Sequence, residues 1–165
     1  PPAEGGGEMI EHVSFEKTTY NVLPYKFEAG TPNYVGSYAF GKAIEYVQTI
    51  GLENIATHEH ALAEYIEEEL SKISQVRVYA AKQPKAGAVS FNVYRADGVL
   101  IHPFDVGVLL DRQGVAVRTG HHCAEPLIDY LGVPGTVRAS VGMYNTKEDI
   151  DTFIAALKKA IMMLE

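Results

Sequence analysis

The sequence predicts an α/β protein whose main part is an α+β two-layer sandwich, with helices packed on a mixed or antiparallel sheet. From residue 37 onward, apolar residues recur at three and four positions, the spacing of helices that bury one face. Short runs rich in Val and Ala alternate with these helices and are typical of strands. Residues 1–33 are instead rich in Gly, Pro and Thr, so we expect an N-terminal arm before the sandwich.

The arm is expected over residues 1–36 and the sandwich over residues 37–165. Alternation of residue types within residues 12–27 suggests two short strands or a hairpin. The arm has no evident way to bury its own apolar residues, so we expect it to pack on another domain or on a second subunit. Because the chain starts at Pro1 with a loop-like composition, we also expect it to be a piece of a longer protein.

Residues that start and stop helices delimit the elements of the sandwich. Pro103 suits a first helical turn, Gly114 suits a helix end, and Asn145 or Thr146 suits a cap that precedes acidic residues. We expect helices at residues 37–50, 53–73, 103–112, 126–131 and 146–164, and strands at residues 76–79, 88–93, 115–118 and 136–141. The acidic face formed by Glu64, Glu67 and Glu68 is expected to point into solvent.

The composition excludes some classes of partner. The net charge of -7 leaves no cationic excess to neutralise phosphates, so we expect no nucleic acid to bind. No apolar run approaches the length of a membrane span, so we expect no membrane partner. The single cysteine cannot form an internal disulfide and favours a reducing, cytoplasmic location.

The densest functional signal is Arg118-Thr119-Gly120-His121-His122-Cys123-Ala124-Glu125-Pro126. A lone cysteine is most often a buried, inert, small apolar residue. Here it follows a strand in a loop of Gly, His and Thr, and the nearby cationic side chains would favour the reactive thiolate. Zinc binding is the rival interpretation, but three consecutive residues project in divergent directions and no second cysteine exists. We therefore rank nucleophilic use of Cys123 above metal binding, and expect no metal site.

Two further positions could bind an anion. Arg138 lies in an expected strand, where its guanidinium could either pair with a carboxylate of the protein or clamp a substrate carboxylate in a bidentate manner. Gly30-Thr31-Pro32-Asn33 precedes the first expected helix, and a hydroxyl and backbone N–H groups at such a place could receive a phosphate. The same four residues are also an ordinary turn and capping sequence.

Four motifs in this order carry a family resemblance: Pro1-Pro2-Ala3-Glu4-Gly5-Gly6-Gly7-Glu8-Met9-Ile10, Phe27-Glu28-Ala29-Gly30-Thr31-Pro32-Asn33, Ala116-Val117-Arg118-Thr119-Gly120-His121-His122-Cys123-Ala124, and Val137-Arg138-Ala139-Ser140 with Met143-Tyr144-Asn145-Thr146. They resemble the group II, SUF-type cysteine desulfurases and selenocysteine lyases of the aminotransferase class V family. The resemblance implies the small C-terminal domain of a fold type I transferase that depends on pyridoxal 5'-phosphate (PLP), preceded by an arm from the end of the large PLP domain.

The resemblance also implies an activity and its residues. Such enzymes convert L-cysteine to L-alanine and keep the sulfur as a persulfide for iron–sulfur cluster assembly. Cys123 would be the nucleophile, Arg138 would hold the substrate carboxylate, and Arg118 would line the same pocket. Thr31, with Gly30, would reach the PLP phosphate of the neighbouring subunit of a homodimer. A sulfur-acceptor protein of the SUF system would be the partner, and His121 and His122 receive no role.

Two departures from the family pattern matter. Tyr34-Val35-Gly36 stands where the family often has Thr-Gly-Gly, and none of the lysines lies in the Ser-x-His-Lys motif that holds PLP. We therefore expect the isolated chain to bind no PLP covalently and to be inactive. The alternatives are a sulfur-carrier or interaction module that accepts sulfur on Cys123 without generating it, and another class V enzyme.

Overall fold

The computed structural model describes residues 2–165, so Pro1, the first residue of the first motif, lies outside the described part. The chain divides into two compact units, of which the first ends at Ile50 and the second is Gly51–Glu165. The division expected at residue 36 concerns the domains of a longer enzyme and stays a prediction, because contacts within this chain group the following helix with the first unit.

The first unit contains the expected hairpin. Strand β1 (Ile10–Val13) pairs antiparallel with β2 (Thr18–Tyr20), and a short 3-10 helix follows at Tyr25–Phe27. Among the described residues of this unit, Met9 is the only apolar side chain in the buried core, whereas Phe15 is fully exposed. Within the first unit, the hairpin therefore leaves most of its apolar residues uncovered.

Helix α1 (Tyr34–Ile50) begins three residues earlier than expected because Asn33 caps it. The Asn33 Oδ1 atom accepts a hydrogen bond from the Gly36 amide at 2.9 Å. A Cβ atom at Gly36 would lie 2.5 Å from the Asn33 side chain, so glycine leaves room for this cap. No residue of α1 is buried, although Tyr38, Phe40 and other large apolar residues lie on it.

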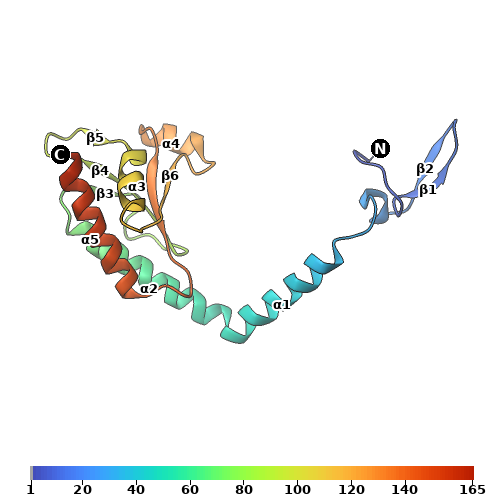
Figure 1. The fold of residues 1–165 in the computed structure, drawn as a ribbon, viewed down its shortest axis with the longest axis horizontal. Helices are drawn as coiled ribbons and strands as arrows, with labels where there is room; N and C mark the ends of the chain where they lie inside the picture. The colour runs from blue at the N-terminus through green and yellow to red at the C-terminus, as the bar shows by residue number, and fades with distance from the viewer. Residues whose placement is uncertain (1) are drawn as a thin grey trace. The chain divides into compact units, whose positions relative to one another are not determined.

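The second unit is built on a five-stranded sheet. Its strands are β3 (Val76–Val78), β4 (Ala88–Tyr94), β5 (Leu100–Ile101), β6 (Arg118–Gly120) and β7 (Thr136–Ser140). The order is β3-β4-β7-β6, with β5 also paired to β4, and every pairing is antiparallel. The helices are α2 (Leu52–Ser71), α3 (Pro103–Asp111), α4 (Glu125–Leu131) and α5 (Lys147–Leu164), as Figure 1 shows.

Alternation along the central strands separates two faces of the sheet. Val89, Phe91 and Val93 of β4 are fully buried and join the core with residues of α2, α3 and α5. The rings of Phe91 and Phe153 lie 5.9 Å apart and connect the sheet to α5. Since neighbouring residues of a strand point to opposite faces, Ser90 and its register partner Arg138 on β7 lie on the face away from this core.

The fold class of the sequence prediction is confirmed, and two details differ. The strand expected at residues 115–118 lies instead at Arg118–Gly120, because Val115 and Val117 pack against the core without pairing to a neighbouring strand. The two-residue strand β5 was not expected, since so short a segment has no detectable alternation.

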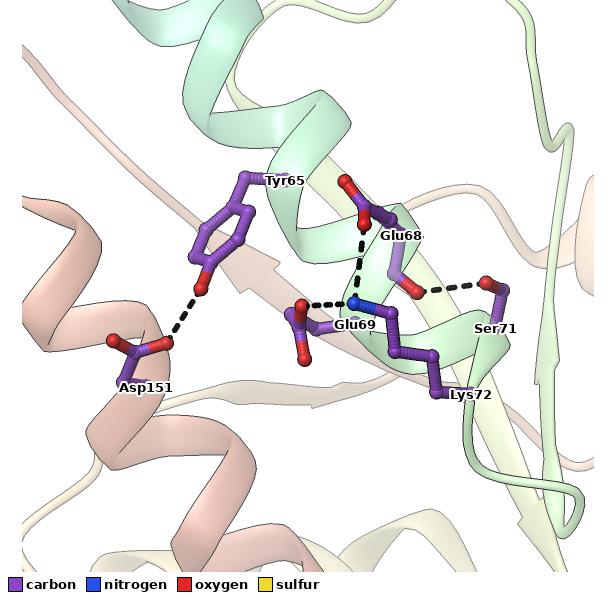
Figure 2. Close-up of polar contacts among 6 residues, drawn as sticks. All are labelled: Tyr65, Glu68, Glu69, Ser71, Lys72 and Asp151. Carbon is purple, nitrogen blue, oxygen red and sulfur yellow. Dashed lines mark hydrogen bonds and ion pairs between the residues drawn. The ribbon is translucent and has the colours of Figure 1, made fainter.

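Several polar side chains of α2 form contacts with one another or with α5 (Figure 2), so the polar face of this helix is only partly solvated as expected. The Tyr65 hydroxyl donates to Asp151 of α5 at 2.7 Å, and this hydrogen bond raises the pKa of Tyr65. Hydrogen bonds to Glu69 and Glu68 raise the pKa of Lys72 to about 12. Glu64 and Glu68 are exposed as expected.

Glu67, however, does not point into solvent. Its carboxylate is largely covered, pairs with Lys85 and accepts a hydrogen bond from the Lys82 amide at 3.0 Å. These two contacts hold the loop between β3 and β4 against α2. Within residues 2–165, none of the helices has both the length and the apolar character that crossing a bilayer requires.

Candidate functional site around Cys123

Cys123 lies in the turn between β6 and α4. It is a free cysteine and its side chain is exposed, so the buried, inert alternative does not describe it. The backbone φ angles of His122 and Cys123 are +57° and +59°, a left-handed conformation that residues other than glycine seldom adopt. The Ala124 amide donates to the His121 carbonyl at 2.9 Å and closes the turn. The thiol therefore projects from a tight, strained turn.

Arg118 contacts this thiol directly. Its Nη2 atom lies 3.5 Å from Cys123 Sγ and donates a hydrogen bond to it. The two residues are five positions apart and face each other because the chain reverses between them. The guanidinium therefore places a hydrogen-bond donor and a positive charge beside the sulfur atom.

Arg138 lies beside Arg118 on the sheet. The two arginines are register partners on β6 and β7, and such partners have Cβ atoms about 4.5–5.5 Å apart on one face. The Arg138 Nε atom is buried and has no hydrogen-bond partner among the described residues, and no carboxylate in residues 2–165 forms an ion pair with this side chain. An unsatisfied guanidinium nitrogen next to a second arginine suits a carboxylate that this chain does not supply.

A hollow of about 340 Å³ opens on this face of the sheet. Its lining includes Ser90, His122, Leu127 and Arg138. The hollow therefore combines an apolar wall from α4 with a cationic wall from β7, a combination that small-molecule sites use to orient a charged ligand.

The two histidines of the loop diverge. His121 is exposed, and its Nδ1 atom lies 3.8 Å from Glu125 Oε1. The His122 Nε2 atom instead lies 2.9 Å from Thr136 Oγ1 and 3.1 Å from the Thr136 carbonyl oxygen. Within the described part of the chain, no group of three or more His, Cys, Asp or Glu side chains is arranged to hold a metal ion.

Gly30 and Thr31 lie in the first unit, whereas Cys123, Arg118 and Arg138 lie together in the second. Gly30 has a φ of +89°, and a Cβ atom at Gly6 would lie 2.6 Å from its amide nitrogen, so the backbones of the two glycines lie close together. Thr31 is exposed, and no hydrogen bond of its hydroxyl occurs among the described residues. A free hydroxyl just before the start of α1 fits a phosphate group.

Comparison with known proteins places the whole arrangement in a family. The model of the family "Aminotransferase class-V" matches residues 1–153. The chain belongs to this family. Among curated proteins, this class-V chain is 48% identical over 164 residues to a probable cysteine desulfurase of Xylella fastidiosa, covering 99% of this chain and 38% of that relative. It is 47% identical over 158 residues to a cysteine desulfurase of Cronobacter sakazakii, covering 95% of this chain and 37% of that relative.

Solved structures agree with these relatives. The class-V chain matches the cysteine desulfurase CsdA of Escherichia coli with a TM-score of 0.87 and 34% identity, over 99% of this chain and 39% of that one. It matches a cysteine desulfurase of Thermococcus onnurineus with a TM-score of 0.85 and 39% identity, over 99% of this chain and 40% of that one. The class-V chain thus spans less than half the length of the relatives that it matches.

Sequence reasoning did not find the contact between His122 and Thr136. The two residues are 14 positions apart, in a turn and in β7, and the expected elements do not place them together. A histidine pair beside a cysteine gave no indication of which ring would point inward. The contact follows from the register of β6 with β7. Gly120, the last residue of β6 before the turn, pairs with Thr136 and so brings Thr136 close to His122.

Proposed function

We propose that this chain is the C-terminal part of a PLP-dependent cysteine desulfurase, which converts L-cysteine to L-alanine and leaves the sulfur as a persulfide on Cys123. The observation that supports the proposal most strongly is the exposed Cys123 thiol, whose sulfur lies 3.5 Å from Arg118. Arg118 in turn is the register partner of Arg138 on the neighbouring strand. Relatives named cysteine desulfurase match almost the entire chain. Residues 1–36 would be the arm from the end of the large PLP domain, and residues 37–165 the small domain.

The residues of this chain then have defined tasks. Arg138 binds the carboxylate of L-cysteine through its free guanidinium edge and so orients the substrate sulfur toward the loop. Arg118 stabilises the Cys123 thiolate. The thiolate forms an S–S bond with the substrate sulfur while the substrate C–S bond breaks. The electron pair of that bond stays with the substrate carbon, which takes up a proton and ends as the methyl group of alanine.

PLP would supply the electron sink that lets the C–S bond break. Within this chain, Gly30 and Thr31 would hold its phosphate through the turn before α1, and they would do so in the neighbouring subunit of a homodimer. The uncovered apolar residues of the hairpin and of α1 support a role for this unit in contacts with another subunit or domain. A structurally similar protein, the cystine C-S lyase C-DES, carries a PLP cofactor in its structure.

The finer assignment is to the group II, SUF-type branch, supported by the block from Arg118 to Ala124. The partner would be a sulfur-acceptor protein of the SUF system that delivers sulfur to iron–sulfur cluster assembly, and the substrate would be L-cysteine or L-selenocysteine. An exposed free thiol also favours a reducing, cytoplasmic location.

The test uses the full-length protein that contains this chain. It should release alanine from L-cysteine, and mass spectrometry after a single turnover should show one added sulfur atom on Cys123. The Cys123→Ala variant should lose both signals and keep the absorbance of bound PLP. Retained desulfurase activity in that variant would instead favour another class V enzyme.

A second arm of the test uses the 165-residue chain, which we propose to be inactive by itself because no lysine lies in a Ser-x-His-Lys context. Alanine release by this chain with added PLP would refute its inactivity. If the full-length protein makes no alanine but Cys123 accepts sulfur from a persulfide donor, the protein is a sulfur carrier.

A further inference from the structure

The turn that presents Cys123 is unfavourable by itself. Both of its central residues, His122 and Cys123, have positive φ angles, and neither is glycine. Consecutive positive φ angles are typical of turns that prefer Gly, Asn or Asp, since a Cβ atom crowds the backbone in this conformation. Such strain persists only where surrounding structure holds the residues in place.

The side chain of His122 provides such a hold. Its Nε2 atom lies within hydrogen-bonding distance of both Thr136 Oγ1 and the Thr136 carbonyl oxygen, at 2.9 and 3.1 Å. Thr136 is only 2% exposed and pairs with Gly120 across β6 and β7. The imidazole thus connects His122, the residue before Cys123, to a buried residue of β7.

The residue that receives this contact is itself fixed. Asn92 of β4 is fully buried, and its Nδ2 atom donates to the Gly135 carbonyl at 2.9 Å and to the Tyr79 hydroxyl at 3.1 Å. Gly135 immediately precedes Thr136. The start of β7 is therefore bound to Asn92 of β4, which also contacts Tyr79 just after β3, and it can serve as a rigid support for the loop.

His121 offers no comparable support. Its ring is exposed, lies near Glu125 at 3.8 Å and, like His122, lines the hollow beside Arg138. Of the two histidines, only His122 has a hydrogen-bonding contact with β7, so the two provide a matched pair for comparison.

We propose that His122 is a positioning residue, whose imidazole, bound to Thr136, sets the place of Cys123 Sγ relative to Arg118. The proposal rests on the proposed function of Cys123 as the sulfur acceptor and adds a residue to it. In this role His122 acts on Cys123 through the turn, although its ring also lines the hollow beside Arg138.

The ring is suited to the task because it is neutral near neutral pH. Burial is the largest influence and lowers the pKa of His122; the hydrogen bond to Thr136 comes second and opposes it, and the charges of Arg138 and Arg118 lower the pKa further. A neutral ring with its proton on Nε2 donates to the Thr136 carbonyl and adds no third cation beside the two arginines.

The experiment compares His122→Ala, His122→Gln and the control His121→Ala in the full-length protein. We expect His122→Ala to lower kcat for alanine release about tenfold or more with KM changed less than about twofold, because Arg138 stays in place. His122→Gln, which keeps a donor, should recover most of kcat, and His121→Ala should keep the wild-type rate of Cys123 alkylation. Equal alkylation rates in the two alanine variants would overturn the proposal, as would a loss of activity confined to KM.

A second readout does not depend on catalysis. Alkylation of Cys123 by iodoacetamide should slow in His122→Ala and in Arg118→Gln. In this double-mutant cycle, the double variant should be no slower than Arg118→Gln alone, because both substitutions disrupt the same contact, that between Arg118 and Cys123. Additive effects would contradict the proposal. If wild type releases no alanine, the proposed function fails and this cycle alone decides about His122. If His122→Ala does not fold, as judged by its urea midpoint, the same cycle with Thr136→Val in its place decides.

Discussion

Arg118 and Arg138 are register partners on the neighbouring antiparallel strands β6 and β7, so two guanidinium groups start from adjacent positions on one face of the sheet. Like charges directly opposite each other are destabilising unless an anion lies close by. Arg118 contacts the Cys123 sulfur at 3.5 Å, whereas Arg138 keeps a buried Nε atom without a partner among the described residues. Under the proposed function, Arg118 contacts the sulfur of the protein and Arg138 binds the carboxylate of the substrate.

Arg138→Lys in the full-length protein tests whether Arg138 binds the carboxylate of the substrate. Lysine keeps the charge but loses the planar pair of donors, and a hydrogen bond between charged groups contributes about 1.5–3 kcal/mol. We expect kcat/KM for L-cysteine to fall about tenfold to a hundredfold, mainly through KM. Arg112→Lys, at the exposed end of α3, is the control and should leave both constants unchanged. An unchanged KM in Arg138→Lys would exclude a carboxylate clamp.

Arg118→Gln tests whether Arg118 increases the reactivity of the Cys123 sulfur. Glutamine can still donate a hydrogen bond but carries no charge, so the thiolate becomes less favoured. The contact is exposed, and a loss of about 0.5–1.5 kcal/mol corresponds to alkylation of Cys123 that is about two- to tenfold slower at pH 7. The effect should shrink in high salt, which already screens the wild-type contact. Alkylation at the wild-type rate would show that Arg118 does not influence the thiol.

The depressed pKa of His122 makes stability depend on pH. Below the ordinary histidine value of about 6.5 the unfolded chain takes up a proton at this residue and the folded chain resists it. Stability is therefore lost as the pH falls through this range, and the loss stops once the folded state also binds the proton. We expect the urea midpoint of wild type to fall more between pH 7.5 and 5.5 than that of His122→Gln. The control His12→Gln, in the exposed hairpin, should retain the wild-type slope.

The sequence was sufficient for what depends on local signals. Thr146 caps α5 through a complete capping box with Asp149, and Pro103 lies in the first turn of α3, as the residue types predict. The partnership of Arg118 with Arg138 was suggested only by family resemblance, because it depends on the register of β6, and the strand itself was expected three residues too early. Register is set by long-range pairing, which spacing along one sequence does not contain.

The capping box itself can be tested on stability. The Thr146 hydroxyl accepts a hydrogen bond from the Asp149 amide at 3.4 Å, and the Asp149 carboxylate accepts one from the Thr146 amide at 3.0 Å, which lowers the pKa of Asp149. Thr146→Ala should cost about 0.5–2 kcal/mol in urea unfolding. Thr152→Ala, inside the same helix, removes a hydroxyl that bonds only to the preceding turn and should be neutral or slightly stabilising. Equal losses at both positions would indicate that the cap contributes nothing specific.

The close approach of Gly135 to Gly120 gives the last prediction. A Cβ atom at Gly135 would lie 3.0 Å from the Gly120 Cα atom and 3.2 Å from its carbonyl carbon and oxygen, and these backbone atoms cannot rotate away. Gly120 is the last residue of β6 before the turn, so Gly135→Ala should displace the segment that carries Cys123. We expect a loss of about 1–3 kcal/mol in stability from the overpacking, together with slower alkylation of Cys123.

Gly98→Ala is the matched control for this substitution, because Gly98 also has a positive φ but faces open space. It should show the backbone strain alone, with a loss of about 1 kcal/mol and an unaltered rate of alkylation. If both variants react with iodoacetamide at the wild-type rate, the contact between the two glycines does not hold the turn, and the support for Cys123 comes from the His122 side alone.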